Sequence, residues 1–521
     1  MLTALAARLY ARFEAPWHVL GWVMLVPWFA ALERIGTLPQ ALAAGVLCSV
    51  VFELAVFDWF APAIDAYAGA PPGTGLLLLG MLAPWLQPQC VATAVAWRVA
   101  RSRGLGWGRI AVAMAGAYVG SEWLVPKLFG DTLGYGLWPS SRWRQGAELL
   151  GVSGLTAILV LANVGVLAVL QALGRPGAFS YRVRQAGTPA GAVLAMVASL
   201  TLFGSWRLAS LRVEDAPLLR AGIVQGALRR YDALAAEVGT WEAVARILDT
   251  YLGLSDRALT TEPLELLVWP ETVYPTTFGS PKTPEGGAFD RVIANFVAQA
   301  GVPLVFGTYD REGEAEFNAA AFLEPPVNGR AEFATYRKAS LFPLTERVPA
   351  VLDSPRVRRW LPWLGTWQPG RSPEAVAVRL PGGEVVRVAP LICYDALEPR
   401  HAAAAVADGA DLIVTLSNDS WFDAGAGPWM HLVGAAFRSI ETRRPQVRAT
   451  NTGVSAVIDA TGELRDTAGV DEARVIVATV PAGPRGLTTA VRFGPWLGPL
   501  GLGVAGATLF AAGLAFPRRF R

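Results

Sequence analysis

A carboxylate, an ammonium group and a thiol stand at places in this sequence where catalytic side chains commonly occur. Glu271 follows an apolar strand pattern that ends in Trp269-Pro270, and because proline cannot extend a central strand we expect Glu271 to project from the strand end. Lys338 and Glu346 flank an apolar turn. A lysine there could donate hydrogen bonds to a developing oxyanion, and Glu346 could hold that lysine or share the proton transfer.

The thiol belongs to Cys393, which closes the apolar run Val388–Ile392 and is followed by polar residues. A nucleophilic cysteine must become a thiolate, which requires a nearby base or cation. Glu271 and Lys338 are the candidate partners. Taken alone, each motif has a simpler interpretation, namely a solvated loop glutamate, a surface ion pair and an inert buried thiol. Taken together, the three motifs favour one active site.

The segments that must position these residues alternate between strand and helix patterns. Helical patterns lie near 232–252, 287–300, 397–408 and 428–443, and such alternation indicates a layered α/β domain. The expected strands are Ala221–Gln225, Leu264–Trp269, Val302–Thr308, Asn318–Leu323, Glu384–Ile392, Asp411–Ser417, Gln446–Thr450, Ser455–Asp459 and Arg474–Val480.

The composition argues against a purely soluble protein. Hydrophobic residues make up 53% of the 521 residues and charged residues only 17%, against about 25% in soluble domains. The net charge of +3 is too small to favour a nucleic-acid partner. Three cysteines cannot form a disulfide framework, three histidines are too few for a His-rich metal centre, and no Gly-rich phosphate loop occurs. We therefore expect no metal and no cofactor.

Long apolar stretches explain this composition. Six of them approach or reach the roughly 20 residues that cross a bilayer, and a seventh, about 496–516, ends the chain. The six are about 17–33, 39–62, 73–100, 107–126, 147–173 and 188–209. We expect three parts: a transmembrane bundle over 1–212, an α/β domain over 218–485, and a closing transmembrane helix with a basic tail over 493–521.

Short basic loops set the expected orientation. Arg98, Arg101, Arg103 and Arg109 separate the third and fourth stretches, and Arg175, Arg182 and Arg184 separate the fifth and sixth. Because such loops stay in the cytoplasm, the α/β domain is expected on the outer face. Arg8 and Arg12 conflict with this scheme. Residues 3–15 are open to three interpretations: a half-helix, an interfacial amphipathic helix, or the remnant of a first span.

The motifs as a set resemble a known enzyme family. Trp269-Pro270-Glu271, Tyr336–Pro349, Ile392–Asp395 and Leu416–Phe422 are similar to the motifs of the carbon–nitrogen hydrolase (nitrilase) superfamily. Carried between transmembrane stretches, the pattern resembles the bacterial apolipoprotein N-acyltransferases. The match extends through Gly427–Leu432, Arg438–Glu441 and Arg448–Ala456. The resemblance implies a nitrilase-like four-layer α-β-β-α sandwich inserted before the last helix of a polytopic α-helical membrane bundle.

The resemblance also implies roles for individual residues. Cys393 would be the nucleophile, Glu271 the general base, and Lys338 the group that stabilises the oxyanion. Five further residues match supporting positions: Glu346, Tyr394, Asn418, Trp421 and Trp269. Asp395 stands where these acyltransferases usually have glutamate, Ser340 replaces a histidine, Thr345 replaces a glycine before Glu346, and the loop 129–136 keeps only Leu-Gly-Tyr of the family pattern.

The implied reaction is acyl transfer from a phospholipid, through a cysteine thioester, to the N-terminal amine of S-diacylglyceryl-cysteine on lipoproteins. The implied location is the bacterial inner membrane, with the catalytic domain on the periplasmic side. Asp395 and the altered loop leave one alternative, a membrane-tethered nitrilase-type amidase or an acyltransferase with a different amine acceptor. A catalytically silent lipid- or lipoprotein-binding relative is a third interpretation, which the complete set of Glu271, Lys338 and Cys393 opposes.

Overall fold

The computed structural model describes residues 1–211, 217–229, 231–327, 332–348, 353–361, 364–422, 425–483 and 486–514. The predicted basic tail, the end of the closing helix beyond residue 514 and Pro349 of the lysine motif lie outside these residues. The chain divides into two compact units, Met1–Leu211 with Phe493–Arg521, and Arg212–Arg492. Each unit is described by itself.

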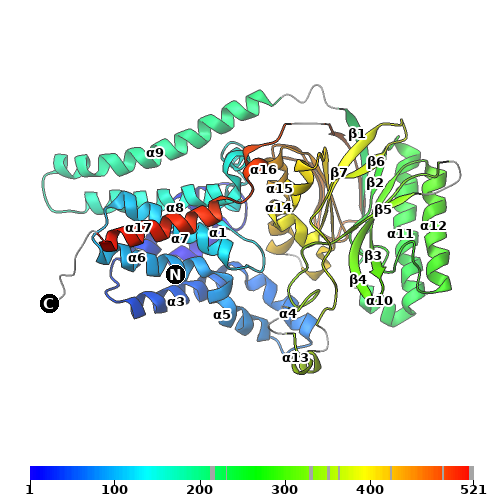
Figure 1. The fold of residues 1–521 in the computed structure, drawn as a ribbon, viewed down its shortest axis with the longest axis horizontal. Helices are drawn as coiled ribbons and strands as arrows, with labels where there is room; N and C mark the ends of the chain where they lie inside the picture. The colour runs from blue at the N-terminus through cyan, green and yellow to red at the C-terminus, as the bar shows by residue number, and fades with distance from the viewer. Residues whose placement is uncertain are drawn as a thin grey trace. The chain divides into compact units, whose positions relative to one another are not determined.

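The first unit is helical. Its helices are α1 Leu2–Tyr10, η1 Trp17–Trp22, α2 Val26–Leu32, α3 Leu38–Val56, η2 Asp58–Phe60, α4 Ala61–Ala68, α5 Thr74–Leu86, α6 Pro88–Ser102, α7 Trp107–Leu124, η3 Leu133–Leu137, η4 Trp143–Gly146, α8 Ala147–Leu173, α9 Phe179–Ser210 and α17 Leu497–Leu514. Figure 1 shows the long helices α8 and α9 running beside each other. At about 1.5 Å per residue, the nine-residue α1 is too short to cross a bilayer, so the basic segment 3–15 holds no full span.

Among the described residues, three helices are long and apolar enough to cross a membrane: α3, Trp143–Leu173 and α9. A fourth candidate is the pair α5 and α6, which is bent by 46°. The other three expected stretches form helices that are shorter or less apolar. Residues Trp17–Leu32 and Leu497–Phe510 are shorter apolar helices, and α7 carries Arg109 and Glu122 within its 18 residues.

Small residues let α7 pack closely on α17 within this unit. A Cβ atom added to Gly116 would lie 2.6 Å from the Gly501 carbonyl oxygen, and one added to Gly120 would lie 2.8 Å from Leu502. Glycines four residues apart on one face allow helix backbones to approach, as in many membrane proteins. The less apolar α7 is therefore covered by a neighbouring helix.

The second unit contains two six-stranded sheets in its described residues, with the strand orders β12-β1-β2-β3-β4-β5 and β11-β10-β9-β8-β7-β6. The strands are β1 Leu218–Gln225, β2 Leu266–Val268, β3 Leu304–Glu312, β4 Ala315–Leu323, β5 Phe333–Arg337, β6 Val376–Arg379, β7 Val385–Ile392, β8 Leu412–Ser417, β9 Gln446–Thr450, β10 Ser455–Ile458, β11 Leu464–Ala468 and β12 Arg474–Pro481. Strands β1, β2 and β3 are parallel, as are β7, β8 and β9. Their carboxyl ends are the places where α/β proteins build sites.

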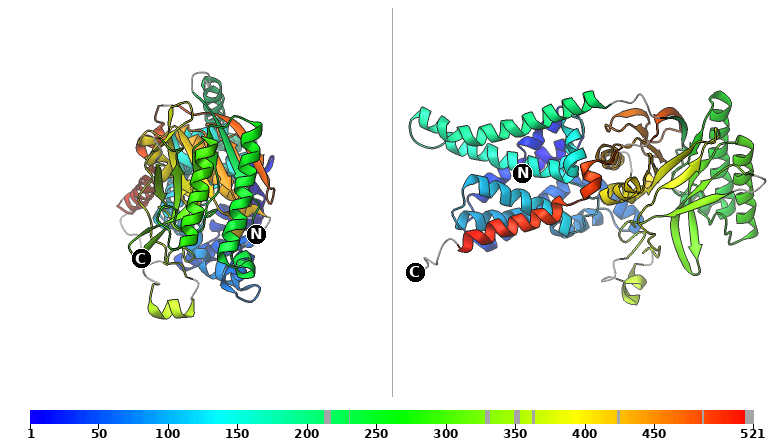
Figure 2. Two further views of the ribbon diagram at one scale, coloured as in Figure 1. Left: turned by 90° about the vertical axis from the view of Figure 1, so that its right-hand side faces the viewer. Right: turned by 45° about the horizontal axis from the view of Figure 1, so that its top comes forward.

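Helices cover the outer faces of both sheets. Those of this unit are α10 Tyr231–Val238, α11 Thr240–Thr261, α12 Pro284–Ala300, α13 Pro355–Trp360, η5 Cys393–Leu397, α14 Pro399–Ala407, η6 Asp419–Trp421 and α15 Ala426–Thr442, with α16 Thr489–Phe493 at the boundary between the units. Figure 2 shows α11 and α12, in green, side by side, and Ile247 and Ile293 from them pack with Leu267 of β2. On the second sheet, Ala405 and Ala435 pack with Leu391 of β7.

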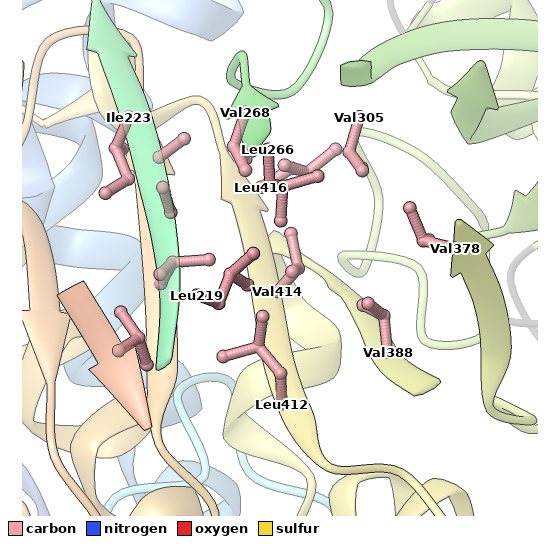
Figure 3. Packing of buried hydrophobic residues seen from close by; sticks show 14 of the residues in the cluster. Leu219, Ile223, Leu266, Val268, Val305, Val378, Val388, Leu412, Val414 and Leu416 are labelled. Atoms are coloured by element: carbon pink, nitrogen blue, oxygen red, sulfur yellow. The ribbon is translucent and has the colours of Figure 1, made fainter. Parts of the chain in front are cut away.

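A third apolar layer lies between the two sheets. It joins side chains such as Leu219, Ile223 and Leu266 of the first sheet to Val388, Leu412 and Val414 of the second (Figure 3). The inward residues alternate along each strand with outward ones, because strand side chains point to opposite faces in turn. The layers therefore run helix, sheet, sheet, helix, and the predicted nitrilase-like α-β-β-α sandwich is confirmed.

All nine predicted strands are present, and β9 has the predicted bounds Gln446–Thr450. The sequence patterns missed β5, β6 and β11, each of which is an edge strand of its sheet. Edge strands have one unpaired side and carry weaker apolar patterns than central strands. The helix expected near 232–252 is divided into α10 and α11 at Gly239, whose φ of 87° favours glycine.

Candidate active site

Glu271 lies two residues beyond Trp269, which follows the parallel strand β2. Three donors converge on its carboxylate, and the residue is 4% exposed. Lys338 Nζ and Asn318 Nδ2 donate to Oε1 over 3.1 and 2.8 Å, and the backbone nitrogen of Asn418 donates to Oε2 over 2.8 Å. This set of donors holds the carboxylate in one orientation, as a general base requires.

Lys338 follows the edge strand β5 and bridges two carboxylates. Its Nζ lies 3.1 Å from Glu271 Oε1 and 2.8 Å from Glu346 Oε1, and the residue is 1% exposed. Burial works to lower the pKa of Lys338, but the negative charges of Glu271 and Glu346 raise that pKa well above its ordinary value. The buried group is therefore an ammonium ion that can donate to a developing oxyanion.

Glu346 is held from its other side. Its Oε2 accepts a hydrogen bond of 2.6 Å from the backbone nitrogen of Phe342, so the turn between Lys338 and Glu346 closes on itself. Glu346 Oε1 also accepts from Asn318 Nδ2 over 3.0 Å. Glu271, Lys338, Glu346 and Asn318 therefore form one largely buried cluster that joins the segments after β2 and β5 to Asn318 within β4.

Cys393 begins η5 at the carboxyl end of β7 and is half-buried. Burial raises the pKa of its thiol well above the ordinary value, and the negative charge of Glu271 raises it further, while Lys338 lowers it. At neutral pH the resting group is a thiol, so attack on a substrate requires a base. Glu271 is the carboxylate with the largest electrostatic effect on this thiol, which makes it the candidate base.

The other sequence-predicted residues take different places. The ring of Tyr394 meets Phe342 edge-on at 5.4 Å beside the nucleophile, and Asn418 contacts Glu271 through its backbone. Trp269 does not lie among the charged groups: it is fully buried in the outer core and donates from Nε1 to Ser255 Oγ over 2.9 Å. The side chain of Trp421 lies outside the described residues.

Sequence reasoning missed Asn318, whose Nδ2 donates to both carboxylates. The one available signal was a lone amide in the strand pattern Phe317–Leu323, which is otherwise apolar. His431 is not among the residues that the sequence motifs predicted for the site, yet its ring contacts the nucleophile's backbone. His431 Nε2 lies 3.1 Å from the Cys393 carbonyl oxygen.

Asp395 and Ser340, two departures from the family pattern, contact one another. The Asp395 carboxylate accepts from the Ser340 backbone nitrogen over 2.7 Å and from Tyr336 Oη over 2.9 Å. Ser340 Oγ lies 2.8 Å from Nε2 of His401, which belongs to α14. Burial raises the pKa of Asp395 to about 6.

One group of side chains within the described ranges has metal-ligand chemistry. The ligand atoms of Cys393, Asp419 and His431 lie within 4.8 Å of one another. Both Asp419 oxygens already accept hydrogen bonds, one from Arg448 Nη2 over 2.6 Å and one from Ser417 Oγ over 2.7 Å. These contacts and the arginine's positive charge disfavour a divalent cation there.

Gly307 of β3 supports the backbone of the predicted base. A Cβ atom at this position would lie 2.4 Å from Thr272 N and 2.5 Å from Glu271 Cα, and neither atom can move without moving Glu271. We expect Gly307→Ala to slow acyl-enzyme formation on the order of 100-fold, because small displacements of catalytic groups cost that much. Gly382→Ala, with no atom within 4 Å of the new Cβ, should leave the rate unchanged. Single-turnover rates of both variants test this, and equal rates would contradict it.

Comparison with known proteins shows the family of this chain. The family model described as Carbon-nitrogen hydrolase matches residues 220–488, which is more than half of the chain. The chain belongs to the carbon–nitrogen hydrolase family. A second model, described as Apolipoprotein N-acyltransferase N-terminal domain, matches residues 4–165.

Two relatives match this chain over most of its length. The Apolipoprotein N-acyltransferase of Bdellovibrio bacteriovorus is 26% identical over 488 residues, which cover 90% of this chain and 85% of the relative. The Apolipoprotein N-acyltransferase of Geobacter metallireducens is 26% identical over 516 residues, which cover 96% of this chain and 91% of the relative. With the apolar helices described above, these matches identify the chain as a membrane protein.

A solved structure is also similar to part of the chain. An amidase from Nesterenkonia sp. AN1, in a mutant form that shows covalent addition of an acetamide moiety at its active-site cysteine, is 21% identical, with a TM-score of 0.37. The match covers 52% of this chain and 94% of the amidase.

Proposed function

We propose that this protein transfers an acyl chain from a phospholipid to the N-terminal amine of S-diacylglyceryl-cysteine on lipoproteins, through a thioester on Cys393. The observation that carries the proposal is the buried cluster of Glu271, Lys338 and Glu346 beside the Cys393 thiol. The match of residues 4–165 to the N-terminal domain of apolipoprotein N-acyltransferases supports this acceptor over that of a simple amidase.

The first half-reaction forms the acyl-enzyme. Glu271 accepts the proton of the Cys393 thiol, and the thiolate attacks the carbonyl carbon of the phospholipid ester. Lys338 Nζ donates to the oxyanion of the tetrahedral intermediate, where a buried ammonium group is most effective. The C–O bond breaks, the lysophospholipid oxygen takes the proton from Glu271, and a thioester remains. Dividing the transfer in this way replaces one difficult step by two easier ones.

The second half-reaction consumes the thioester. The free α-amine of the diacylglyceryl-cysteine attacks the thioester carbonyl carbon, and Glu271 accepts a proton from the nitrogen. The C–S bond breaks as the amide forms, and the proton returns to the Cys393 sulfur. Water competes with the amine for the thioester, so the site must exclude water while it waits for the second substrate.

We also propose where the protein lies. The domain plan 1–212, 218–485 and 493–521, with the basic loops in the cytoplasm, supports an inner-membrane protein whose catalytic domain is periplasmic. Both proposed substrates are anchored in lipid. A catalytic domain that is connected to apolar helices at both ends would remain next to the surface that holds them.

The proposed thioester can be observed directly. Purified protein is incubated with phosphatidylethanolamine vesicles, and we expect its intact mass to increase by one acyl chain, which hydroxylamine removes. Cys393→Ala should show no increase in mass. Cys48→Ala removes a half-buried thiol of α3 and should gain the same mass as the unmodified protein. Adding a diacylglyceryl-cysteine peptide should discharge the thioester and yield the N-acyl peptide.

Other outcomes would overturn the proposal. Hydrolysis of a small amide without acylation of the peptide would favour the membrane-tethered amidase. Transfer to a different amine, with no product from the peptide, would favour another acceptor. A protein that never acquires an acyl mass under these conditions would contradict the thioester mechanism itself.

A further inference from the structure

The backbone of Cys393 has an unusual conformation. Its φ is 48°, in the left-handed region that residues with a Cβ rarely adopt. Such a conformation persists where surrounding contacts hold it in place, and it is typical of functional sites. The residue begins η5 directly after β7 ends, so its backbone direction determines where the thiol points.

Hydrogen bonds hold this turn from both sides. On the preceding side, Asp395 Oδ2 accepts from the backbone nitrogen of Ile392 over 3.0 Å. On the following side, the carbonyl oxygen of Cys393 lies 3.1 Å from His431 Nε2. A carbonyl oxygen can only accept, so the hydrogen bond requires the hydrogen to be on Nε2 of the imidazole.

A buried chain of charges orients His431. Its Nδ1 lies 2.9 Å from Asp419 Oδ1, and Arg448 Nη2 donates to Asp419 Oδ2 over 2.6 Å. Arg448 Nη2 also lies 3.2 Å from His431 Nδ1. The side chains of Asp419 and Arg448 are fully buried, and that of His431 is 6% exposed. Although burial opposes it, the interaction with His431 and the positive charge of Arg448 hold the pKa of Asp419 below its usual range, which keeps an ionised carboxylate against the ring.

A histidine that only filled space would not need this arrangement. The neighbouring buried residues of α15, Leu432, Ala435 and Ala436, are apolar, and burying an arginine and an aspartate costs desolvation free energy that their ion pair and hydrogen bonds must offset. The arrangement is that of a carboxylate that orients an imidazole, whose second nitrogen then binds a fixed target. Here the target is the backbone of the predicted nucleophile.

We propose that His431 is a positioning residue: its Nε2–H hydrogen bond to the Cys393 carbonyl oxygen holds the nucleophile in the left-handed conformation that directs its thiol toward Glu271 and Lys338. Asp419 and Arg448 act through His431 by fixing the direction of its ring. This inference rests on the proposed function, because the thiol must be the attacking group for its direction to matter.

Two substitutions at one position separate the two contacts of His431. In His431→Gln, the side-chain amide nitrogen can occupy the place of Nε2 and donate to the Cys393 carbonyl oxygen. In His431→Asn, the shorter amide can occupy the place of Nδ1 and contact Asp419, but it cannot reach that carbonyl. The two variants are otherwise similar in polarity and charge.

We expect the variants to differ in the chemical step. With phosphatidylethanolamine vesicles, His431→Asn should lower the single-turnover rate of thioester formation on the order of 100-fold, with the lipid concentration at half-maximal rate unchanged. His431→Gln should stay within about fivefold of the unmodified protein. His18→Asn, in the helical unit, serves as the control and should have no effect.

Each outcome distinguishes the two proposals. If the unmodified protein forms no thioester, the proposed function fails and the role of His431 falls with it. If it forms the thioester and the two variants react at equal rates, the positioning role is wrong while the proposed function stands. If the melting temperatures of both variants fall equally but their rates of thioester formation differ, the positioning role is still supported. A loss of stability that both variants share cannot explain a difference between their rates.

A second measurement applies if neither variant folds. The chain has three histidines, so 15N labelling of histidine gives few ring signals. We expect one ring with a hydrogen on Nε2 whose signal shifts when iodoacetamide modifies Cys393. If no Nε2–H signal responds to this modification, the positioning role is contradicted.

Discussion

Glu271→Gln is expected to slow thioester formation on the order of 1000-fold, within the range that a general base contributes. Glutamine keeps the shape of the carboxylate but cannot accept the thiol proton. In addition, its amide group would bring hydrogens toward the three donors that now converge on the carboxylate, from Lys338, Asn318 and Asn418. Rapid-quench mass spectrometry of the acyl-enzyme measures the effect.

The pH dependence of this variant gives a sharper test. Without a base, attack depends on the small fraction of Cys393 already ionised, and the thiol pKa is raised by burial. That fraction grows tenfold for each unit of pH below the thiol pKa, so the residual rate should rise steadily from neutral to alkaline pH. The unmodified protein should lack this steep rise. A rate that is independent of pH and within about tenfold of the unmodified protein would contradict the role of Glu271.

The exposed glutamate of an ion pair on α11 is the matched control. Glu242 accepts from Arg246 Nε over 2.9 Å, and its side chain is 54% exposed. Surface pairs of this kind contribute little to stability or activity. Glu242→Gln should therefore form the thioester at the rate of the unmodified protein.

Lys338→Met is expected to slow transfer on the order of 100–1000-fold and to destabilise the catalytic unit as well. The ammonium group is the cation between Glu271 and Glu346, and its removal leaves two buried carboxylates that share the Asn318 amide. Breaking a buried ion pair by removing one partner costs about 3–5 kcal/mol. The oxyanion also loses its donor, which costs on the order of 100–1000-fold in rate. Denaturation in detergent and acyl-enzyme formation measure the two effects.

A compensating substitution separates stability from catalysis. Lys338→Met combined with Glu346→Gln removes one buried charge of each sign, so most of the lost stability should return. Acyl-enzyme formation should not return, because no ammonium group faces the oxyanion. If the double variant recovered both stability and acyl-enzyme formation, the role of Lys338 would be contradicted. Lys282→Met, which breaks an exposed pair with Glu316, should change neither quantity.

Much of this protein's organisation was predictable because it is written in local patterns. Apolar runs indicated a membrane bundle, and alternating patterns predicted the nine strands that form most of the two sheets. Glu271 and Cys393 each follow a parallel strand, where α/β proteins build sites, but β2 and β7 belong to different sheets, so the packing of the two sheets is what brings these strand ends together. The family resemblance then associated these two residues with Lys338, which no strand pattern connects to them.

Tertiary structure alone decided which polar groups meet. Asn318 is 47 residues from Glu271, and Arg448 is 29 residues from Asp419, so no local pattern connects them. Trp269 belongs to the same motif as Glu271, yet its ring packs in the outer core. His431 lies 38 residues from Cys393 and contacts it only because α15 covers the second sheet. Periodicity depends on neighbours along the chain and can be read from sequence, whereas the partners of a buried charge depend on how separate elements pack.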